Sequence, residues 1–595
     1  MNTSPLQPVA IRIPAFWKRT AVLALLIFAG HGASLPSGFF HDDHVHIAHL
    51  KNGGWHPGDF VQASLLGTDV LMVRYWWLQY ETRWHPLRPL TLAIMKVEHT
   101  LCGYRAWPMH AFSLVWHVAN AVLVMLLAWR FLGDAFWATA AGGVFALHPG
   151  HFETVQWVMA QTELTGAFFL LLATLCYANF SGWPRGGGLP ETDAAGSYQW
   201  LIGACAGYAA ALGCRESALV LPAALFVLDC LWGRRIGRRQ WVGYACLVLV
   251  AAVYLLLASR ALGGTFQQGR PHIVPPDDPE FLRFIYTKAL LYFLAVFVYV
   301  PALQIPVGVW LESHLVFGTL LVIAAAAAAW VHFFPAMCER RGAWAWLLWP
   351  AVFLAPLLPV FAASHHLYTP LAGWAVLLAA ALMLGGRKSD KRRRISLVVL
   401  GIAVVGFTVG CNIAGYYLRE QMNAEHALIS SVARHRGRIK AGDHLAFVDM
   451  PLLACTANAT IERELGLEPG STTMHCLTVR PLSAGPDQAG RLTPVEERAL
   501  RVEAAGPAYF SGPEGTALLE VGGWRRMFGE GQRFEPNELF DVVVLQADRS
   551  GVQALRFDFH PSLSREGLFV FRCSYDGSAE LLGFDGQNMG RRPAP

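Results

Sequence analysis

The sequence predicts a polytopic α-helical membrane protein with a β-rich domain at its C-terminal end. Hydrophobic residues make up 54% of its 595 positions and charged residues only 15%, against roughly a quarter in soluble proteins. Apolar runs long enough to cross a bilayer recur up to about residue 420 and then stop. This composition excludes a disordered chain and a single soluble domain. The net charge of +5 is small and the basic residues stand in short runs, which excludes a nucleic-acid-binding protein.

Twelve apolar runs are candidates for transmembrane helices, because a helix needs about 20 mostly apolar residues to cross a bilayer. They are 17–36, 109–131, 135–148, 161–180, 199–213, 218–232, 241–258, 282–300, 315–334, 343–362, 366–385 and 395–418. Arg12, Lys18 and Arg19 stand at the start of the first run, and no cleavage site of small residues follows it. We expect an uncleaved anchor with a cytoplasmic N-terminus.

The positive-inside rule leaves eleven of these runs as spans. Two basic segments should face the cytoplasm: GRRIGRR, before residue 240, and 387–394, which holds six Lys or Arg residues. Both can do so only if one of the apolar runs between them does not cross the membrane. The run 282–300 is the best choice, because it carries Arg283 and Lys288 in its first third. We expect an amphipathic or re-entrant helix there, on the outer face, and a C-terminal tail outside the membrane.

The expected organisation is a membrane domain over 1–425, with an outer loop at 37–108, and an extracytoplasmic β-rich (α+β) domain over 430–595. In the tail, short apolar or alternating segments lie between Gly, Pro and Asp, which is typical of strands. These segments are HLAFVDM, TALLEVGG, FDVVVLQ, ALRFDFH and GLFVFRCS.

The three cysteines of the tail have two alternative states. Cys455 and Cys476 enclose about 20 residues, and a disulfide between them would stabilise the domain by roughly 3 kcal/mol in the chain-entropy model. In this case Cys573 is a buried thiol in the strand FVFRCS. The alternative is three buried thiols.

Two adjacent carboxylates, Asp42 and Asp43, follow the first span within FFHDDHVH. Acidic residues close to lipid are costly unless they have a role, so either Asp is a candidate general base at the membrane surface. A solvated start of a loop is the alternative. The histidines around the pair also suggest a metal site, but we expect none, because adjacent Asp residues cannot easily bind the same ion.

Further polar groups fall on the same outer side of the eleven-span topology. They are Arg88 in RPL; His148, His151 and Glu153 in HPGHFE; Glu163 in QTE; Arg215 and Glu216 in CRES; and His365 and Tyr368 in HHLY. Helix capping would also explain Glu163, and a structural ion pair would explain Arg215 with Glu216. Their convergence on one side favours a shared site.

In this order along the chain, the motifs resemble the membrane half of the GT-C glycosyltransferases. The closest resemblance is to the protein O-mannosyltransferase-like branch, which includes the transmembrane and TPR-containing O-mannosyltransferases. It rests on RPLTLAIMKVEHTLCG, GGVFALHPGHFETVQWVMAQTELTGAFFLLLATLCY, CRESALVLPAALFVLD and LYTPLAGW, and 144–177 is its most specific part. The chain departs from the family in having Arg215-Glu216 for Lys-Glu and His365-His366 for Arg-Tyr, and in lacking TPR repeats.

The resemblance implies a GT-C fold and transfer of a sugar from a polyprenyl-phosphate-linked donor to a hydroxyl of a protein or glycan, outside the membrane. Asp42, with Asp43 as its partner, would be the base of a single inverting displacement that needs no metal. The residues expected to bind donor or acceptor are Arg88, His148, His151, Glu153, Glu163, Arg215, Glu216, His365 and Tyr368. Among these, Arg88 and Arg215 would hold the phosphate, and Glu216 would orient Arg215.

We expect an integral protein of a bacterial inner membrane. The tail, which lies on the side where the motifs converge, is our candidate for acceptor recognition in place of the family's repeat array. Two other functions remain open at this stage. One is a transporter or flippase for a lipid-linked sugar, and the other is a non-catalytic scaffold for envelope assembly.

Overall fold

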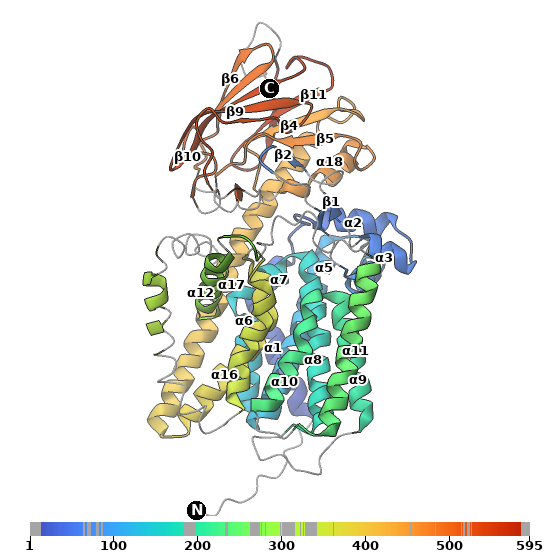
Figure 1. Ribbon diagram of the computed structural model, residues 1–595, viewed down its shortest axis with the longest axis vertical. Coiled ribbons are helices and arrows are strands. Elements are labelled where there is room, and N and C mark those ends of the chain that lie inside the picture. Colours follow the sequence, from blue (N-terminus) through green and yellow to red (C-terminus); the bar gives the residue numbers. More distant parts are fainter. Residues whose placement is uncertain are drawn as a thin grey trace, which may run out of the picture.

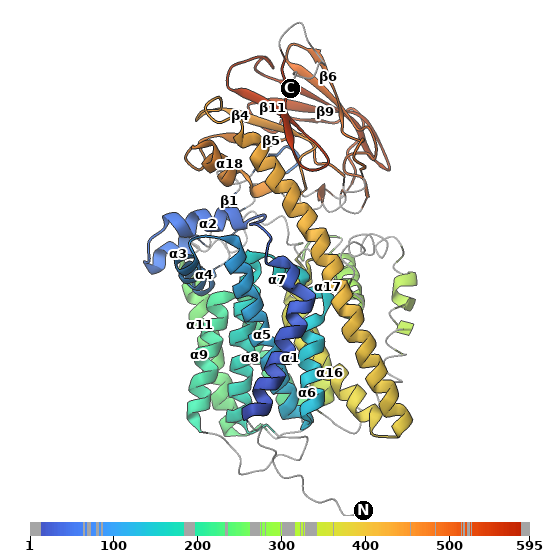
Figure 2. The same ribbon diagram turned by 180° about the vertical axis from the view of Figure 1, so that it is seen from behind.

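The computed structural model describes residues 13–584 apart from a set of internal segments. These segments are 64–65, 68–72, 79–82, 85–86, 184–196, 232–235, 262–273, 275, 280, 298, 300–313, 315, 322, 325–326, 328–341, 361, 453, 482–483, 513–514, 516–517, 520–523 and 525. The molecule consists of a helical bundle and a strand-rich C-terminal domain. The long helix α17 (Asp390–Ala433) runs from the bundle into that domain (Figures 1 and 2).

The helices of the bundle lie where the apolar runs predict them. Their bounds are α1 (Ile13–His31), α5 (Ala106–Leu132), α6 (Ala135–Leu147), α8 (Gln161–Ser181), α9 (Tyr198–Cys214), α10 (Leu221–Leu231), α11 (Arg238–Ala261), α15 (Ala343–Leu354), α16 (Tyr368–Gly386) and α17. Gly133 ends α5 and Gly182 ends α8 with φ of 68° and 70°, a left-handed conformation that glycine adopts without steric cost. Asp134 then begins α6, because its side chain accepts the backbone N–H groups of Phe136 and Trp137.

Five described helical segments are long and apolar enough to cross a membrane. They are Ala106–Leu132, Val158–Ser181, Arg238–Ala261, Ser364–Gly386 and Asp390–Ala433. These helices identify an integral membrane protein, and α6 and α15 are shorter apolar helices beside them. The expected span at 315–334 lies in large part outside the described residues, so the total of eleven spans stays a prediction.

The helix α12 (Phe281–Phe297) forms over the run 282–300 that we expect not to cross the membrane. It lies at the end of the bundle that faces the C-terminal domain (Figure 1). There, the hydroxyl of Tyr292 is 2.8 Å from Nδ1 of His366. Lys288 is buried, with its ammonium 4.8 Å from the centre of the Phe284 ring, and so does not face solvent. The interfacial placement of α12 stays a prediction.

The outer loop between α1 and α5 is folded. It contains α2 (Asp43–Asn52), α3 (Pro57–Ala63), α4 (Pro89–Cys102), β1 (Leu66–Gly67), β2 (Arg74–Tyr75) and β3 (Arg83–Trp84). Leu50, Phe60 and Met95 form a small core between the three helices. Lys96 of α4 donates hydrogen bonds to the carbonyls of Gly53 and Gly54, which follow α2. The middle of α4 is thereby fixed relative to the end of α2.

The C-terminal domain holds two five-stranded sheets. The first has the order β12–β11–β4–β5–β2, with β4 (His444–Val448), β5 (Thr473–Cys476), β11 (Leu568–Cys573) and β12 (Ala579–Leu581). The second has the order β6–β7–β10–β9–β8, with β6 (Arg491–Glu496), β7 (Ala499–Glu503), β8 (Arg533–Phe534), β9 (Phe540–Asp548) and β10 (Gly551–Phe559). The helix α18 (Asn458–Leu465) connects β4 to its parallel neighbour β5, since parallel strands need a crossover.

Four of the five strand segments expected in the tail contain strands, namely β4, β9, β10 and β11. The prediction of a strand at TALLEVGG is wrong in its described part, because Leu518 and Leu519 lie in no strand. The apolar side chain of Leu519 is buried in the core, and burial does not require a strand. Cys573 is buried at the end of β11, as expected. The side chain of Cys455 lies outside the described part of the chain, so its disulfide with Cys476 stays a prediction.

The outer loop and the tail are interlocked. The loop strand β2 is the edge strand of the first tail sheet and runs parallel to β5. Trp76 and Trp77, which follow β2, are only 4% and 1% exposed within the core of the tail. The indole N–H of Trp76 donates to the carbonyl of Leu477 at 2.8 Å. The helix α17 also continues through the expected boundary at 425–430.

Reporter fusions test the orientation of the chain. A fusion after residue 390 should report a cytoplasmic location and a fusion after residue 430 an extracytoplasmic one. The physical reason is that α17 separates the basic cluster at 387–394 from the tail, and basic segments are retained on the cytoplasmic side. The opposite location at either point would overturn the eleven-span topology.

Candidate active site

The acid pair stands at the start of α2, where the outer loop meets the bundle. Asp43 is 1% exposed, and its two carboxylate oxygens accept different backbone N–H groups. Oδ2 accepts from Phe40 at 3.0 Å, and Oδ1 accepts from Met159, in the turn before α8, at 2.7 Å. Burial, together with the charge of Asp42, raises the pKa of Asp43 well above its ordinary value. Asp43 thus joins the outer loop to the bundle.

Asp42 keeps an oxygen that no described group uses. Its side chain is 21% exposed, and Oδ2 is 3.9 Å from Nε2 of His46. The buried Oδ1 has no hydrogen-bond partner among the described residues. The other ring nitrogen of His46, Nδ1, is 3.1 Å from the carbonyl oxygen of Ala63, so Nε2 is the nitrogen that faces Asp42. Of the two acids, Asp42 is therefore the more exposed one, and it keeps an oxygen that no described group uses.

Two arginines and two glutamates form crossed ion pairs beside α8. Arg88 donates to both carboxylate oxygens of Glu216, from Nε at 3.0 Å and from Nη2 at 2.7 Å. Arg215 pairs with Glu163 at 2.5 Å between Nη2 and Oε1. Burial opposes ionisation of Glu216, but the charges of Arg88 and Arg215 outweigh it and lower the pKa of Glu216 below its ordinary value.

The expectation that Glu216 orients Arg215 by pairing with it is wrong. Arg215 has φ −153° and ψ 127°, an extended conformation in which successive side chains point to opposite sides. Arg215 therefore reaches α8, and Glu216 reaches Arg88 at the start of α4.

Glu153 and His365 form a further contact between charged or titratable side chains of the site. Glu153, in α7 (Phe152–Gln156), accepts a hydrogen bond from the hydroxyl of Ser364 and lies 3.6 Å from Nδ1 of His365. Burial would raise the pKa of Glu153, but its contacts with His365 and Ser364 hold it below the ordinary value. Its side chain is still 27% exposed, so the carboxylate is within reach of a ligand.

His148, His151 and Tyr368 lie inside the bundle, beneath these groups, and each is fully buried. Nε2 of His148 is 3.1 Å from a backbone carbonyl of α12. The hydroxyl of Tyr368 is 2.7 Å from Nδ1 of His117 and accepts from the amide of Asn120 at 3.1 Å. The rings of His151 and Tyr368 have centres 4.6 Å apart. These three side chains support the site from below and do not line its surface.

Two buried acids near the site, Glu425 and Glu98, are not among the residues predicted from the sequence. Glu425 of α17 is 1% exposed and contacts the chain on both sides of the acid pair. Its spacing from Met422 and Leu428, which are also buried, places it on the buried face of α17 and was the available signal. Glu98 of α4 accepts from the indole of Trp116 at 3.1 Å, and burial raises its pKa to about 7.

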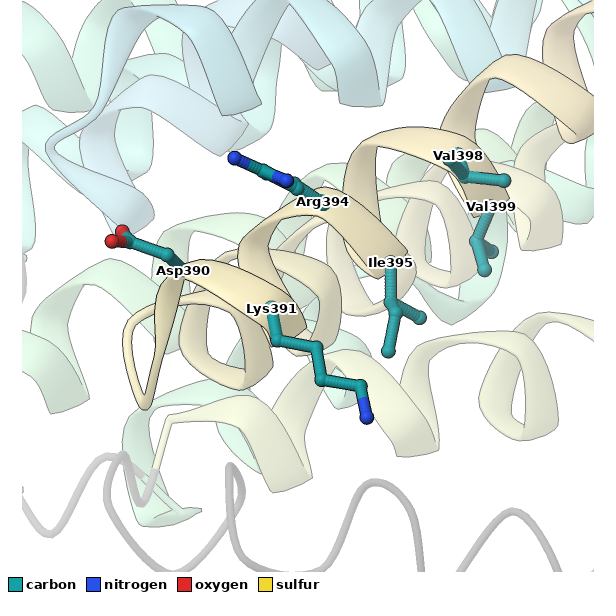
Figure 3. Close-up of a pocket in the computed structure, with 6 residues that line it drawn as sticks. All are labelled: Asp390, Lys391, Arg394, Ile395, Val398 and Val399. Carbon is teal, nitrogen blue, oxygen red and sulfur yellow. The ribbon is translucent and has the colours of Figure 1, made fainter.

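A hollow on the surface lies far from this site, at the start of α17 (Figure 3). It is lined by Asp390, Lys391, Arg394, Ile395, Val398 and Val399, all from one helix. At 1.5 Å per helical residue, Asp390 is roughly 50 Å from Glu425 along α17. The hollow is therefore separate from the candidate active site.

The fold and the site define an integral membrane protein. At one end of its bundle it carries an acid pair and two arginine–glutamate ion pairs. No family model matches the sequence. The protein O-mannosyl-transferase TMTC2 of Mus musculus is 32% identical over 90 residues, which are 15% of this chain and 11% of that protein. Tmtc2 of Drosophila melanogaster is 33% identical over 170 residues, 28% of this chain and 17% of that protein.

The chain thus matches less than a fifth of the length of these curated relatives. Over these stretches the predicted resemblance to protein O-mannosyltransferases is confirmed. Among solved structures, that of ArnT from Cupriavidus metallidurans in the apo state is 14% identical, with a TM-score of 0.47. The similarity covers 77% of this chain and 89% of that one.

Loss of one partner from the buried ion pair should destabilise the protein strongly. Glu163→Met leaves the Arg215 guanidinium buried without its carboxylate, at a cost of about 3–5 kcal/mol. The double variant Glu163→Met, Arg215→Met should recover most of that loss. Thermal unfolding in detergent measures both effects.

The matched control is Glu464→Gln in the exposed pair Arg463–Glu464, whose side chains are 50% and 49% exposed. This change should cost less than about 1 kcal/mol. A double variant that is no more stable than Glu163→Met alone would show that an unpaired buried charge is not the cause.

Proposed function

We propose that this protein is a GT-C-type membrane glycosyltransferase. It transfers a sugar from a polyprenyl-phosphate-linked donor to a hydroxyl of a protein or glycan, at the membrane face that carries the C-terminal domain. The carrying observation is the carboxylate of Asp42, which has an unused oxygen at the junction of bundle and outer loop. The similarity to protein O-mannosyl-transferases supports a sugar transfer, with mannose as the first sugar to test.

Asp42 acts as the general base of a single displacement. It takes the proton of the acceptor hydroxyl while the oxygen of that hydroxyl attacks the anomeric carbon of the donor. The bond between this carbon and the phosphate oxygen breaks, and polyprenyl phosphate leaves with the bonding electrons. No general acid is needed, because a phosphate is already a good leaving group. Attack from the opposite face inverts the anomeric centre.

Arg88 is the better of the two candidate ligands for the donor phosphate. Its partner Glu216 is 44% exposed, so a phosphate can approach the pair and share the guanidinium with the carboxylate. Arg215 and Glu163 are only 11% and 8% exposed, and their pair stabilises the start of α8. Glu153, held by His365, is the candidate for binding a sugar or acceptor hydroxyl.

The C-terminal domain lies over this face and is the candidate for recognition of the acceptor (Figure 2). Its strand β2 and both Trp76 and Trp77 come from the outer loop that also carries Asp42. An acceptor held by the tail would therefore sit on the same folded unit as the base.

Asp42→Asn should abolish transfer while the protein still folds and inserts, because an amide cannot take up the proton of the acceptor. Mass spectrometry of glycans and glycoproteins from cells with the wild-type or variant protein measures transfer. Reconstituted protein with polyprenyl-phosphate mannose gives the direct rate. Asp59→Asn is the matched control, since the Asp59 carboxylate caps the N–H of His56 at 2.9 Å and Asn keeps an acceptor. Near-normal transfer by Asp42→Asn would refute the assignment of the base.

Chelation of divalent cations should leave the rate unchanged, because the mechanism uses Arg88 and not a metal to hold the phosphate. The measurement is the transfer rate of reconstituted protein before and after treatment with a chelator. Loss of transfer that one added divalent ion restores would contradict this mechanism. Asp42, His44 and His46 would then be the first ligands to test.

A further inference from the structure

Glu425 of α17 binds the chain on both sides of the acid pair. Its Oε2 accepts the backbone N–H of His41 at 3.0 Å. Its Oε1 is 3.6 Å from Nε2 of His44. The carboxylate is 1% exposed and lies 384 residues along the chain from His41. The single buried carboxylate of Glu425 thus contacts His41 and His44, the residues directly before and directly after the acid pair.

The turn that Glu425 holds is one that a non-glycine residue adopts only with support. His41 has φ 53°, in the left-handed region, immediately before Asp42. Its ring stacks on Trp157, with ring centres 5.6 Å apart and planes 9° from parallel. Because Asp42 is the next residue, a change in this turn moves the Asp42 carboxylate.

The C-terminal domain completes this support. Thr460 of α18 has its hydroxyl 2.8 Å from Nδ1 of His44. Thr456, just before α18, has its hydroxyl 3.4 Å from Nδ1 of His41. A Cβ atom on Gly38 would collide with the ring of His426, so the chain that leads to the acid pair passes very close to α17.

We propose that Glu425 is a positioning residue for the acid pair, through which α17 and the C-terminal domain set the place of the Asp42 carboxylate. This inference rests on the proposed function and names a residue that contacts neither donor nor acceptor. The helix α17 extends unbroken from the bundle, so Glu425 holds the His41 turn on a rigid support. A displacement of about 1 Å at a reacting group can cost 10²-fold in rate.

The test compares Glu425→Ala, Glu425→Gln and Glu420→Ala in the full-length reconstituted protein. Glu425→Ala removes the acceptor of the His41 N–H, and we expect kcat to fall by about 10- to 100-fold with the KM for the donor unchanged within about twofold. Glu425→Gln keeps an acceptor oxygen and should restore kcat to within about threefold of wild type. Glu420, exposed on the same helix, is the matched control and should behave as wild type.

Hydrogen–deuterium exchange of the peptide over 37–48 gives a readout that does not depend on activity. The His41 amide should exchange at least about tenfold faster in Glu425→Ala than in wild type, and at the wild-type rate in Glu420→Ala. Unchanged exchange, unchanged kcat, or a rise in KM alone in Glu425→Ala would overturn the inference. Faster exchange in a protein whose wild type transfers no sugar would support the hold on the turn and refute the proposed function.

Discussion

The hydrogen bonds that Asp43 accepts from Phe40 and Met159 fix the outer loop to the bundle. A buried carboxylate is costly unless its oxygens have donors, so the start of α2 can lie in only one place relative to the turn before α8. Asp42 is the preceding residue, so its position is fixed by the hydrogen bonds of Asp43, and its own Oδ1 makes none with the described residues. One acid of the pair thus serves the fold and leaves the other available for chemistry.

The two arginine–glutamate ion pairs near the acid pair also differ in their exposure to solvent. The pair Arg215–Glu163 is enclosed, whereas the pair Arg88–Glu216 opens toward solvent through its glutamate. The extended backbone at Arg215 is what sends two adjacent, opposite charges to different partners. Each arginine is thereby neutralised by a glutamate, so under the proposed function a donor phosphate would have to compete with a carboxylate.

Hydropathy predicted the described helices of the bundle well, because it is a local property of the chain. The run at 109–131 became α5, and Gly133 and Asp134 mark the end of one helix and the beginning of the next. The strands of the tail were recognisable for the same reason. The segment TALLEVGG was not, since an apolar run shows that residues are buried but not in which conformation.

The sequence predicted a set of residues for the candidate site but not the contacts between them. Motif order brought Asp42, Arg88 and Glu153 to one end of the bundle. It did not separate these from His148 and Tyr368, which belong to the same motifs but face the interior. The contacts of Glu425 join residues hundreds of positions apart, and no local pattern specifies such a partner.

The pairing of β2 with β5 has a consequence for synthesis of the chain. Trp76 and the carbonyl that it binds are 401 residues apart. At 5–20 residues per second, the ribosome needs roughly 20 to 80 s to make the second after the first. During that interval the loop has no sheet to join, and Trp76 and Trp77 lack the core that later buries them. The loop therefore cannot reach its final fold before the C-terminal domain does.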